Sequence, residues 1–198
     1  IGARPCRGHV EHIALRDGDL AYLARLPLPW PPDEVLRHLI DETEWRAETV
    51  TVYGKRHLQP RLTAWHGDRS YTYSGLTLAP QPWTPLLLEI RAAVEQASGH
   101  HFNSVLLNYY RDGRDSMGMH SDDEPELGPE PVIASVSFGE ERQFILRHKA
   151  SRETLKMPLA RGSLLVMRGQ TQHAWQHGIN KSARAMGPRV NLTFRNIL

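Results

Sequence analysis

The chain has 198 residues, 40% of them hydrophobic and 23% charged, which is enough for one soluble domain with a sizeable core. Its 24 Lys and Arg against 22 Asp and Glu give a net charge of +2, a balance that does not by itself indicate a nucleic-acid partner. The single cysteine, Cys6, excludes an internal disulfide framework and a multi-cysteine zinc site, and no apolar run approaches the ~18 residues of a membrane span, so no membrane partner is expected.

Two helices are predicted in the first half of the chain, after about 30 residues without strong periodicity. Apolar side chains at helical spacing predict the first helix from Asp33 to Glu42. The second is marked at both ends, because Thr84 can cap it, Pro85 suits its first position and Gly99 ends it. Each helix is expected to cover a sheet with its apolar face.

The remaining pattern predicts strands joined by turns. In the first half they lie at Glu48–Tyr53, Arg61–Trp65 and Ser70–Thr77. In the second half they lie at Ser104–Tyr110, Pro131–Phe138, Gln143–His148, Ser163–Met167 and Pro188–Arg195. The segment Pro125–Pro131, rich in Pro, Gly and Glu, is predicted to be a loop. Many short strands and few helices favour a mainly β fold, an antiparallel barrel or sandwich with helices packed on one side.

The last predicted strand alternates strictly between apolar and polar residues. Its polar face carries Arg189, Asn191, Thr193 and Arg195. The two arginines are roughly 20 Å apart along a strand. On the inner face of a barrel they would need anionic partners. A small dianion would supply them if strand twist and the long side chains shorten the gap. The alternative is an edge strand with a solvated polar face.

A His-x-Asp triplet, His120 and Asp122, predicts two metal ligands on one face of an extended segment. Two histidines and one carboxylate leave positions open, as in non-haem Fe(II) oxygenases. The triplet alone is weak evidence, and we interpret a second one, His66–Asp68, as a surface loop. The third ligand is expected just before the last strand, where His173 and His177 are both candidates.

Asn108 and Tyr110 also share one face of a predicted strand. Their amide and phenol can hydrogen-bond a carboxylate. The alternative is that Tyr110 is a core residue.

Taken in order and spacing, these motifs resemble the AlkB family of Fe(II)/2-oxoglutarate dioxygenases. The motifs are Asn108-x-Tyr110, His120-x-Asp122, His177 and Arg189-x-Asn191-x-Thr193-x-Arg195. The resemblance covers about residues 33–198. It extends to Gln59–Trp65, Tyr71–Ser74, His120–Glu124 and Ile133–Gly139, which are similar to the members that repair alkylated nucleic acids.

The resemblance implies a double-stranded β-helix (jelly-roll) core with flanking helices, in one domain over residues 1–198. Residues 1–32 would be an N-terminal extension, and about 45–80 a nucleotide-recognition region. Fe(II) would be held by His120, Asp122 and His177. For 2-oxoglutarate, Arg195 and Asn108 would bind the end that chelates iron, Arg189 and Tyr110 would bind the distal carboxylate, and Asn191 and Thr193 would support them. O2 is the second cosubstrate.

Substrate contacts are also implied by the resemblance. Tyr73 would stack the target base against His120, while Tyr71 and Glu124 would touch its edge, with Asp123 beside them. Tyr53, at a hairpin tip, would fill the gap that a flipped base leaves. Arg61, Lys55 and Arg56 would contact phosphates, or be solvated hairpin charges.

The implied activity is oxidative demethylation of N1-methyladenine and N3-methylcytosine in DNA, single- or double-stranded, with RNA as an alternative or additional substrate and with 2-oxoglutarate converted to succinate. Other readings are a dioxygenase acting on protein or a small metabolite, and a non-enzymatic nucleic-acid-binding module with a structural metal. We expect a monomer in a reducing compartment, cytoplasmic if bacterial and nuclear if eukaryotic.

Overall fold

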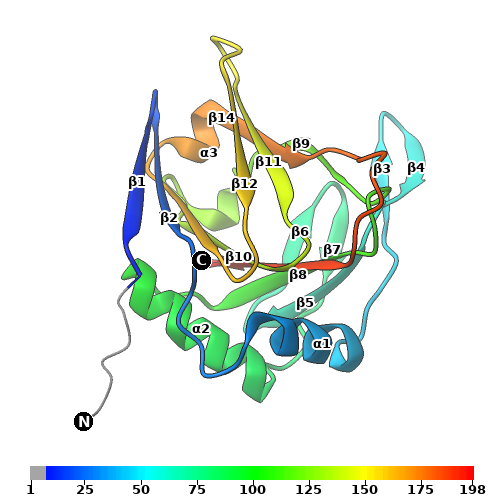
Figure 1. Ribbon diagram of the computed structural model, residues 1–198. Coiled ribbons are helices and arrows are strands. Elements are labelled where there is room, and N and C mark those ends of the chain that lie inside the picture. The colour runs from blue at the N-terminus through cyan, green and yellow to red at the C-terminus, as the bar shows by residue number, and fades with distance from the viewer. Residues whose placement is uncertain (1–7) are drawn as a thin grey trace.

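The computed structural model describes residues 8–198, so Cys6 lies outside the described part (Figure 1). Two sheets form the centre of the molecule. The larger has the order β1-β2-β13-β10-β15-β8-β5 and the smaller β12-β11-β14-β9. All pairs of neighbouring strands in both sheets are antiparallel. The fold is thus mostly β-sheet with flanking helices, as predicted.

The larger sheet contains β1 (Val10–Leu15), β2 (Gly18–Leu23), β5 (Leu62–Gly67), β8 (Ser104–Tyr110), β10 (Ile133–Gly139), β13 (Leu164–Arg168) and β15 (Arg189–Arg195). The smaller contains β9 (Met117–His120), β11 (Arg142–His148), β12 (Thr154–Leu159) and β14 (Trp175–Ile179). Two separate hairpins are formed by β3 (Thr49–Val52) with β4 (Lys55–Leu58), and by β6 (Tyr71–Tyr73) with β7 (Leu76–Leu78). The helices are α1 (Pro32–Glu42), α2 (Pro85–Ser98), α3 (Thr171–Ala174) and a 3-10 turn, η1 (Pro125–Leu127).

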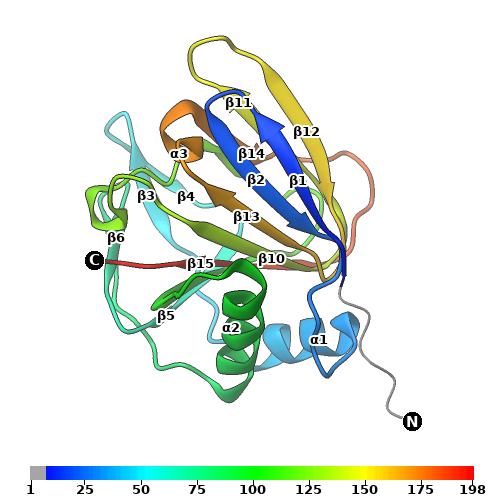
Figure 2. The same ribbon diagram turned by 90° about the vertical axis from the view of Figure 1, so that its left-hand side faces the viewer.

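The helices α1 and α2 lie side by side on the outer face of the larger sheet (Figures 1 and 2). Their apolar stripes, including Val35 and Ile90, pack with Leu107, Val136 and Leu192 in one core cluster. The predicted caps of α2 are present: the Thr84 hydroxyl accepts the Leu87 N–H at 3.2 Å, and Gly99 has a φ of 75°.

The strand β15 is central in the larger sheet, between β10 and β8, and all seven of its residues are buried. The alternative of a solvated edge strand is therefore wrong. Because the apolar face of β15 packs on the helices, its polar face must look toward the smaller sheet. Pairing with β8 sets Arg189 opposite Tyr110 and Asn191 opposite Asn108.

Some segments differ from the expectation. The described part of residues 1–32 contributes the hairpin β1–β2, and β2 pairs with β13, so this part belongs to the larger sheet instead of extending from it. Residues Ser70–Thr77 form two short strands, because Ser74 and Gly75 turn the chain with φ values of 47° and 74°. The predicted loop Pro125–Pro131 contains η1. Strands β1, β2, β4, β9, β12 and β14 had no predicted counterpart.

Within residues 8–198, no helix combines the length and the apolar character that crossing a membrane would require.

The position of β15 predicts a large effect of truncating its apolar face. Replacing the fully buried Leu192 by Ala should lower the free energy of unfolding by about 2–5 kcal/mol, because a cavity is left between sheet and helices. Urea titration measures this difference. Leu88→Ala on α2 is the control, since Leu88 is 41% exposed, and it should change stability far less. Equal losses in the two variants would contradict this packing.

Candidate active site

Three predicted metal ligands converge at one edge of the smaller sheet, where β14 pairs with the edge strand β9. His120 ends β9 and pairs with His177 on β14, while Asp122 follows β9 in a loop. Each offers a ligand atom, and these atoms lie within 4.8 Å of one another. His173 is outside this group, because its Nε2 contacts the Pro129 carbonyl. The third ligand among the two candidates is thus His177.

The charges around these ligands favour metal binding. Burial would raise the pKa of Asp122, but Arg195, whose Nη2 lies 3.0 Å from Oδ1, and the two histidines hold this pKa well below its usual range. Burial lowers the pKa of His177 to about 3, so its ring is neutral. The Nδ1 of His120 lies 2.8 Å from the Gly118 carbonyl, which can only accept, so Nε2 keeps its lone pair.

Gln172 is a residue of this site that the sequence did not reveal. Its side chain is fully buried, its Oε1 accepts the Asp122 N–H at 2.9 Å, and its Nε2 points to the Met167 sulfur at 3.4 Å. Gln172 therefore anchors the backbone that carries the metal-binding carboxylate. Its sequence neighbourhood has no signal for this role, since the contact joins residues 50 apart.

A cavity of about 340 Å³ opens beside the three metal ligands. Its lining includes the metal ligands, all six predicted 2-oxoglutarate contacts and four of the predicted substrate contacts: His120, Asp122, His177, Asn108, Tyr110, Arg189, Asn191, Thr193, Arg195, Tyr71, Tyr73, Glu124 and Arg61. The strand β15 thus brings both of its arginines to one cavity.

The cavity wall offers donors that the described residues 8–198 leave unused. The buried Nε and Nη1 of Arg189 have no hydrogen-bond partner there, and neither has Nε of Arg195. Nη2 of Arg189 donates to Ser137 at 3.0 Å, and its guanidinium carbon lies 5.0 Å from the Tyr110 ring centroid. Arg195 is compensated by a carboxylate, whereas Arg189 is not. Donors of this kind fit an anion with carboxylates near each arginine.

The polar residues between the two arginines hold one another. The Asn191 side-chain amide donates to the Ser135 hydroxyl at 2.7 Å, and the Thr193 hydroxyl donates to Oδ1 of Asn191 at 2.9 Å. These contacts tie Asn191 and Thr193 to each other and to β10.

Arg61 lies in the wall of the cavity, so the expected phosphate contact needs correction. The residue is only 9% exposed. Its Nε donates to Asn108 Oδ1 at 2.8 Å and its Nη1 to the Ser116 carbonyl at 3.2 Å. Because a guanidinium can only donate, it engages the Asn108 oxygen and leaves the amide nitrogen free to donate to a carboxylate.

Two tyrosines and a carboxyl group also line the cavity. Tyr71 is buried and stacks on Trp65 at 5.0 Å, and burial raises its pKa. Tyr73 lies 5.7 Å from the Tyr71 ring, and its hydroxyl lies 3.2 Å from the Gln59 amide nitrogen. Burial also raises the pKa of Glu124, whose Oε2 has no partner within residues 8–198.

Other predicted substrate contacts lie outside the cavity. Tyr53 is fully exposed at the tip of the β3–β4 hairpin, with Lys55 and Arg56 exposed beside it. Asp123 points to Lys149, with its carboxylate 3.4 Å from the ammonium group. A nucleic acid could contact these residues on the outer surface of the protein, outside the cavity.

Comparison with known proteins agrees with this geometry. Residues 31–195 match the model of the 2OG-Fe(II) oxygenase superfamily. The human DNA oxidative demethylase ALKBH2 is 46% identical over 179 residues, which are 84% of this chain and 69% of that protein. The human alpha-ketoglutarate-dependent dioxygenase alkB homolog 3 is 44% identical over 175 residues, which are 83% of this chain. This chain spans 61% of the length of that relative.

The solved structure of OsALKBH1 superimposes with a TM-score of 0.66 at 17% identity, over 94% of this chain and 100% of that one. At this identity the likeness concerns the fold, and it extends over both sheets. The family model covers most of the chain, and human ALKBH2 is matched over more than two thirds of its length. The chain therefore belongs to the AlkB family of the 2OG-Fe(II) oxygenase superfamily.

Proposed function

We propose that this protein removes methyl groups from N1-methyladenine and N3-methylcytosine in DNA by oxidative demethylation. The observation that carries the proposal is one cavity lined by two kinds of groups. The metal ligands and the two arginines of β15 line it together with two tyrosine rings and the half-buried carboxyl group of Glu124. A small metabolite would not need the tyrosines and this carboxyl group. The names of the relatives, DNA oxidative demethylase among them, support the same activity.

The metal and cosubstrate fit the side chains present. His120, Asp122 and His177 would hold Fe(II), as two imidazoles and one carboxylate do in non-haem oxygenases. When bound, Fe(II), 2-oxoglutarate and O2 supply the oxidation of the N-methyl carbon, with release of succinate, CO2 and, from the hydroxylated methyl group, formaldehyde.

The protein's own part is to bind and orient. Arg189 and Tyr110 would bind the distal carboxylate of 2-oxoglutarate, and Arg195 with the Asn108 amide nitrogen would bind the other end. Since both arginines are buried, bulk water is excluded and their charges are little screened. The arrangement fixes which end of the cosubstrate faces His120 and His177.

The base would enter between aromatic rings. Tyr73 and the ring of His120 both line the cavity and would stack on the two faces of the base. Tyr71 and Glu124 would contact its Watson–Crick edge. Because this edge is paired inside a duplex, the target base must be flipped out or single-stranded.

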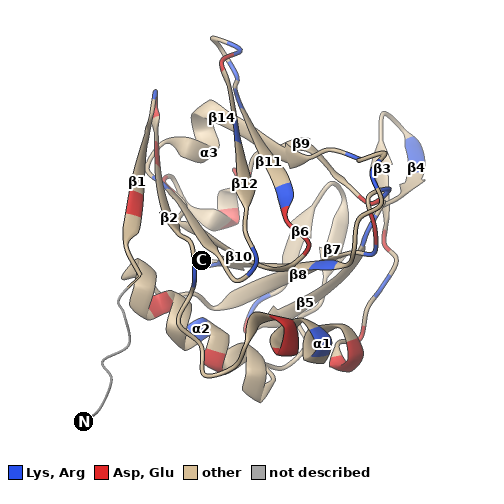
Figure 3. Cartoon of the chain, viewed as in Figure 1, with Lys and Arg blue, Asp and Glu red and all other residues tan. Residues whose placement is uncertain are grey.

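The hairpin β3–β4 would form the outer part of the nucleic-acid surface. Positive charge lies on β4 near its tip, where Lys55 and Arg56 could contact phosphates (Figure 3). The exposed ring of Tyr53 is free to stack on neighbouring bases.

The proposal predicts a defined set of products. Single-stranded DNA with one N1-methyladenine, incubated with Fe(II), 2-oxoglutarate and O2, should yield unmodified adenine, formaldehyde and succinate in equal amounts. His120→Ala should abolish all three products. An RNA oligonucleotide of the same sequence with the same methylated base tests whether RNA is also a substrate. Succinate without base repair would place the substrate elsewhere, and a fully active His120→Ala would refute the assigned metal site.

The affinity for Mn(II) should depend on the triplet His120-x-Asp122 and not on the triplet His66-x-Asp68. Asp122→Asn should weaken Mn(II) binding by about 100-fold or more, since loss of a charged ligand exceeds most effects of residues behind the ligands. Asp68→Asn, in the other triplet, should leave it unchanged, because the Asp68 carboxylate accepts the Trp83 indole N–H at 3.3 Å and is not part of the group of metal ligands found among residues 8–198. Calorimetric titration of Mn(II) measures both constants, and similar losses would argue against the assignment.

Removal of the Tyr73 ring should weaken the reaction with the nucleic acid and leave the binding of 2-oxoglutarate unchanged. Tyr73→Ala should lower kcat/KM for the methylated oligonucleotide by about 10–100-fold, as expected for about 1–3 kcal/mol of base stacking. Tyr73→Phe retains the ring and should keep most of the activity. The KM for 2-oxoglutarate, measured from succinate formation, should be the same in all three proteins. An unchanged kcat/KM in Tyr73→Ala would remove this residue from the base site.

A further inference from the structure

A third buried arginine lies next to the cavity without lining it. Arg142, the first residue of β11, is 3% exposed. Arg195 is paired with Asp122, but the partners of Arg142 within residues 8–198 are carbonyl oxygens, without a carboxylate. Burying a guanidinium without a carboxylate partner costs free energy. Its hydrogen bonds therefore indicate which segments it stabilises.

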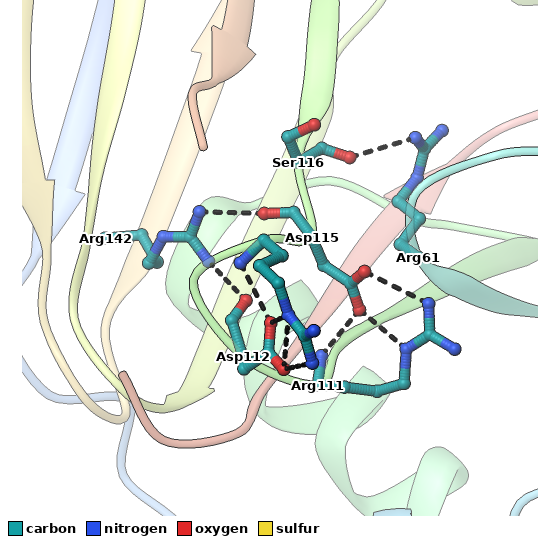
Figure 4. Close-up of polar contacts among 7 residues, drawn as sticks. Arg61, Arg111, Asp112, Asp115, Ser116 and Arg142 are labelled. Carbon is teal, nitrogen blue, oxygen red and sulfur yellow. Dashed lines mark hydrogen bonds and ion pairs between the residues drawn. The ribbon is translucent and has the colours of Figure 1, made fainter. Parts of the chain in front are cut away.

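Arg142 ties together the ends of strands from both sheets. Its Nη1 donates to the Asp112 carbonyl at 3.3 Å and its Nη2 to the Asp115 carbonyl at 2.9 Å (Figure 4). The same Nη2 also donates to the Asn180 carbonyl at 2.7 Å. Residues 111–116 connect β8, which carries Tyr110, to β9, which carries a metal ligand. Asn180 directly follows β14 with the other histidine ligand. One guanidinium thus joins all three strand ends.

The turn itself is a rigid partner for Arg142. Arg111 binds both carboxylate oxygens of Asp115 at 2.8 and 3.0 Å, so this carboxylate is occupied and only the carbonyl remains for Arg142 (Figure 4). Gly113 lies against the segment after β14, where an added Cβ would be 2.8 Å from the Ser182 carbonyl oxygen. The turn and this segment therefore have one close-packed arrangement.

The same guanidinium also lies beside Tyr110. Its central carbon is 5.7 Å from the Tyr110 ring centroid, and that of Arg189 is 5.0 Å from the same centroid. The ring, 1% exposed, is therefore in contact range of two cations. Burial lowers the pKa of Arg189, and the charge of Arg142 lowers it further, so this end of the cavity is strongly positive.

We propose that Arg142 is a positioning residue for the distal carboxylate of 2-oxoglutarate. By fixing the 111–116 turn through three carbonyls, it holds Tyr110 in place opposite Arg189. The inference rests on the proposed cosubstrate site. It predicts that Arg142 acts on the end of the ligand that carries the distal carboxylate and not on the end that chelates the metal.

The test compares two 2-oxo acids on the Mn(II)-loaded protein under anaerobic conditions. 2-Oxoglutarate carries the distal carboxylate and 2-oxobutyrate lacks it, while both share the metal-chelating end. Calorimetry gives both dissociation constants for the wild type, Arg142→Met, Arg142→Lys and the control Arg147→Met. Arg147 is on the same strand, only partly buried and outside the cavity lining.

Arg142→Met should weaken 2-oxoglutarate binding by about tenfold or more, the size of a lost hydrogen bond to a charged group, and leave 2-oxobutyrate binding unchanged. Arg142→Lys keeps the charge but cannot span three carbonyls, so it should show the same selective loss to a smaller degree. If the Met variant does not fold, the Lys variant carries the test.

Equal weakening of both acids would mean a general structural role and would overturn the inference. The inference would also be overturned if Arg142→Lys, or a folded Arg142→Met, had the same ratio of the two dissociation constants as the wild type. A wild-type protein that binds neither acid would instead refute the proposed cosubstrate site, and this inference with it.

Discussion

Burying an arginine costs free energy unless its charge is compensated, and β15 buries two of them on one face. Arg195 pairs with Asp122 at 3.0 Å, and this arginine in turn lowers the pKa of the Asp122 carboxyl group. Among residues 8–198, the Arg189 guanidinium has one hydrogen-bond partner, the Ser137 hydroxyl, and it lies beside the Tyr110 ring. The strand lies at the centre of the larger sheet, with the smaller sheet facing its polar side and two helices covering its apolar side.

The site is therefore a chain of dependent contacts. Gln172 holds the backbone of Asp122, Asp122 pairs with Arg195, and Arg61 turns the Asn108 amide toward the same cavity. Each contact uses a donor that cannot act as an acceptor, or the reverse, so the orientation of each group is determined.

The parts that the sequence predicted well are those governed by local rules. The alternation of β15 and the caps of α2 depend on neighbours within a few residues, and both are present as expected. Strands β9 and β14 are short, and β14 mixes polar and apolar residues on its inner face, so no period was visible. They become strands because they pair with each other and with β11 across the fold.

The same distinction holds for the site. The metal ligands and the arginine strand have fixed spacings that can be recognised in a sequence, and they meet in the structure. Arg61 looked like a surface charge next to a hairpin, because burial is not visible in a sequence and its partner Asn108 is 47 residues away. Gln172 and Arg142 were missed for the same reason, since their roles consist of contacts between distant segments.

The two faces of β15 have different roles, since the apolar face packs in the core and the polar face lines the cavity. A ligand that compensates Arg189 would thus act on the strand at the centre of the folded state. Binding to the native state alone raises stability by mass action, in proportion to the logarithm of ligand concentration above its Kd. The cellular level of a metabolite would then determine how much of the protein stays folded as well as how fast it turns over.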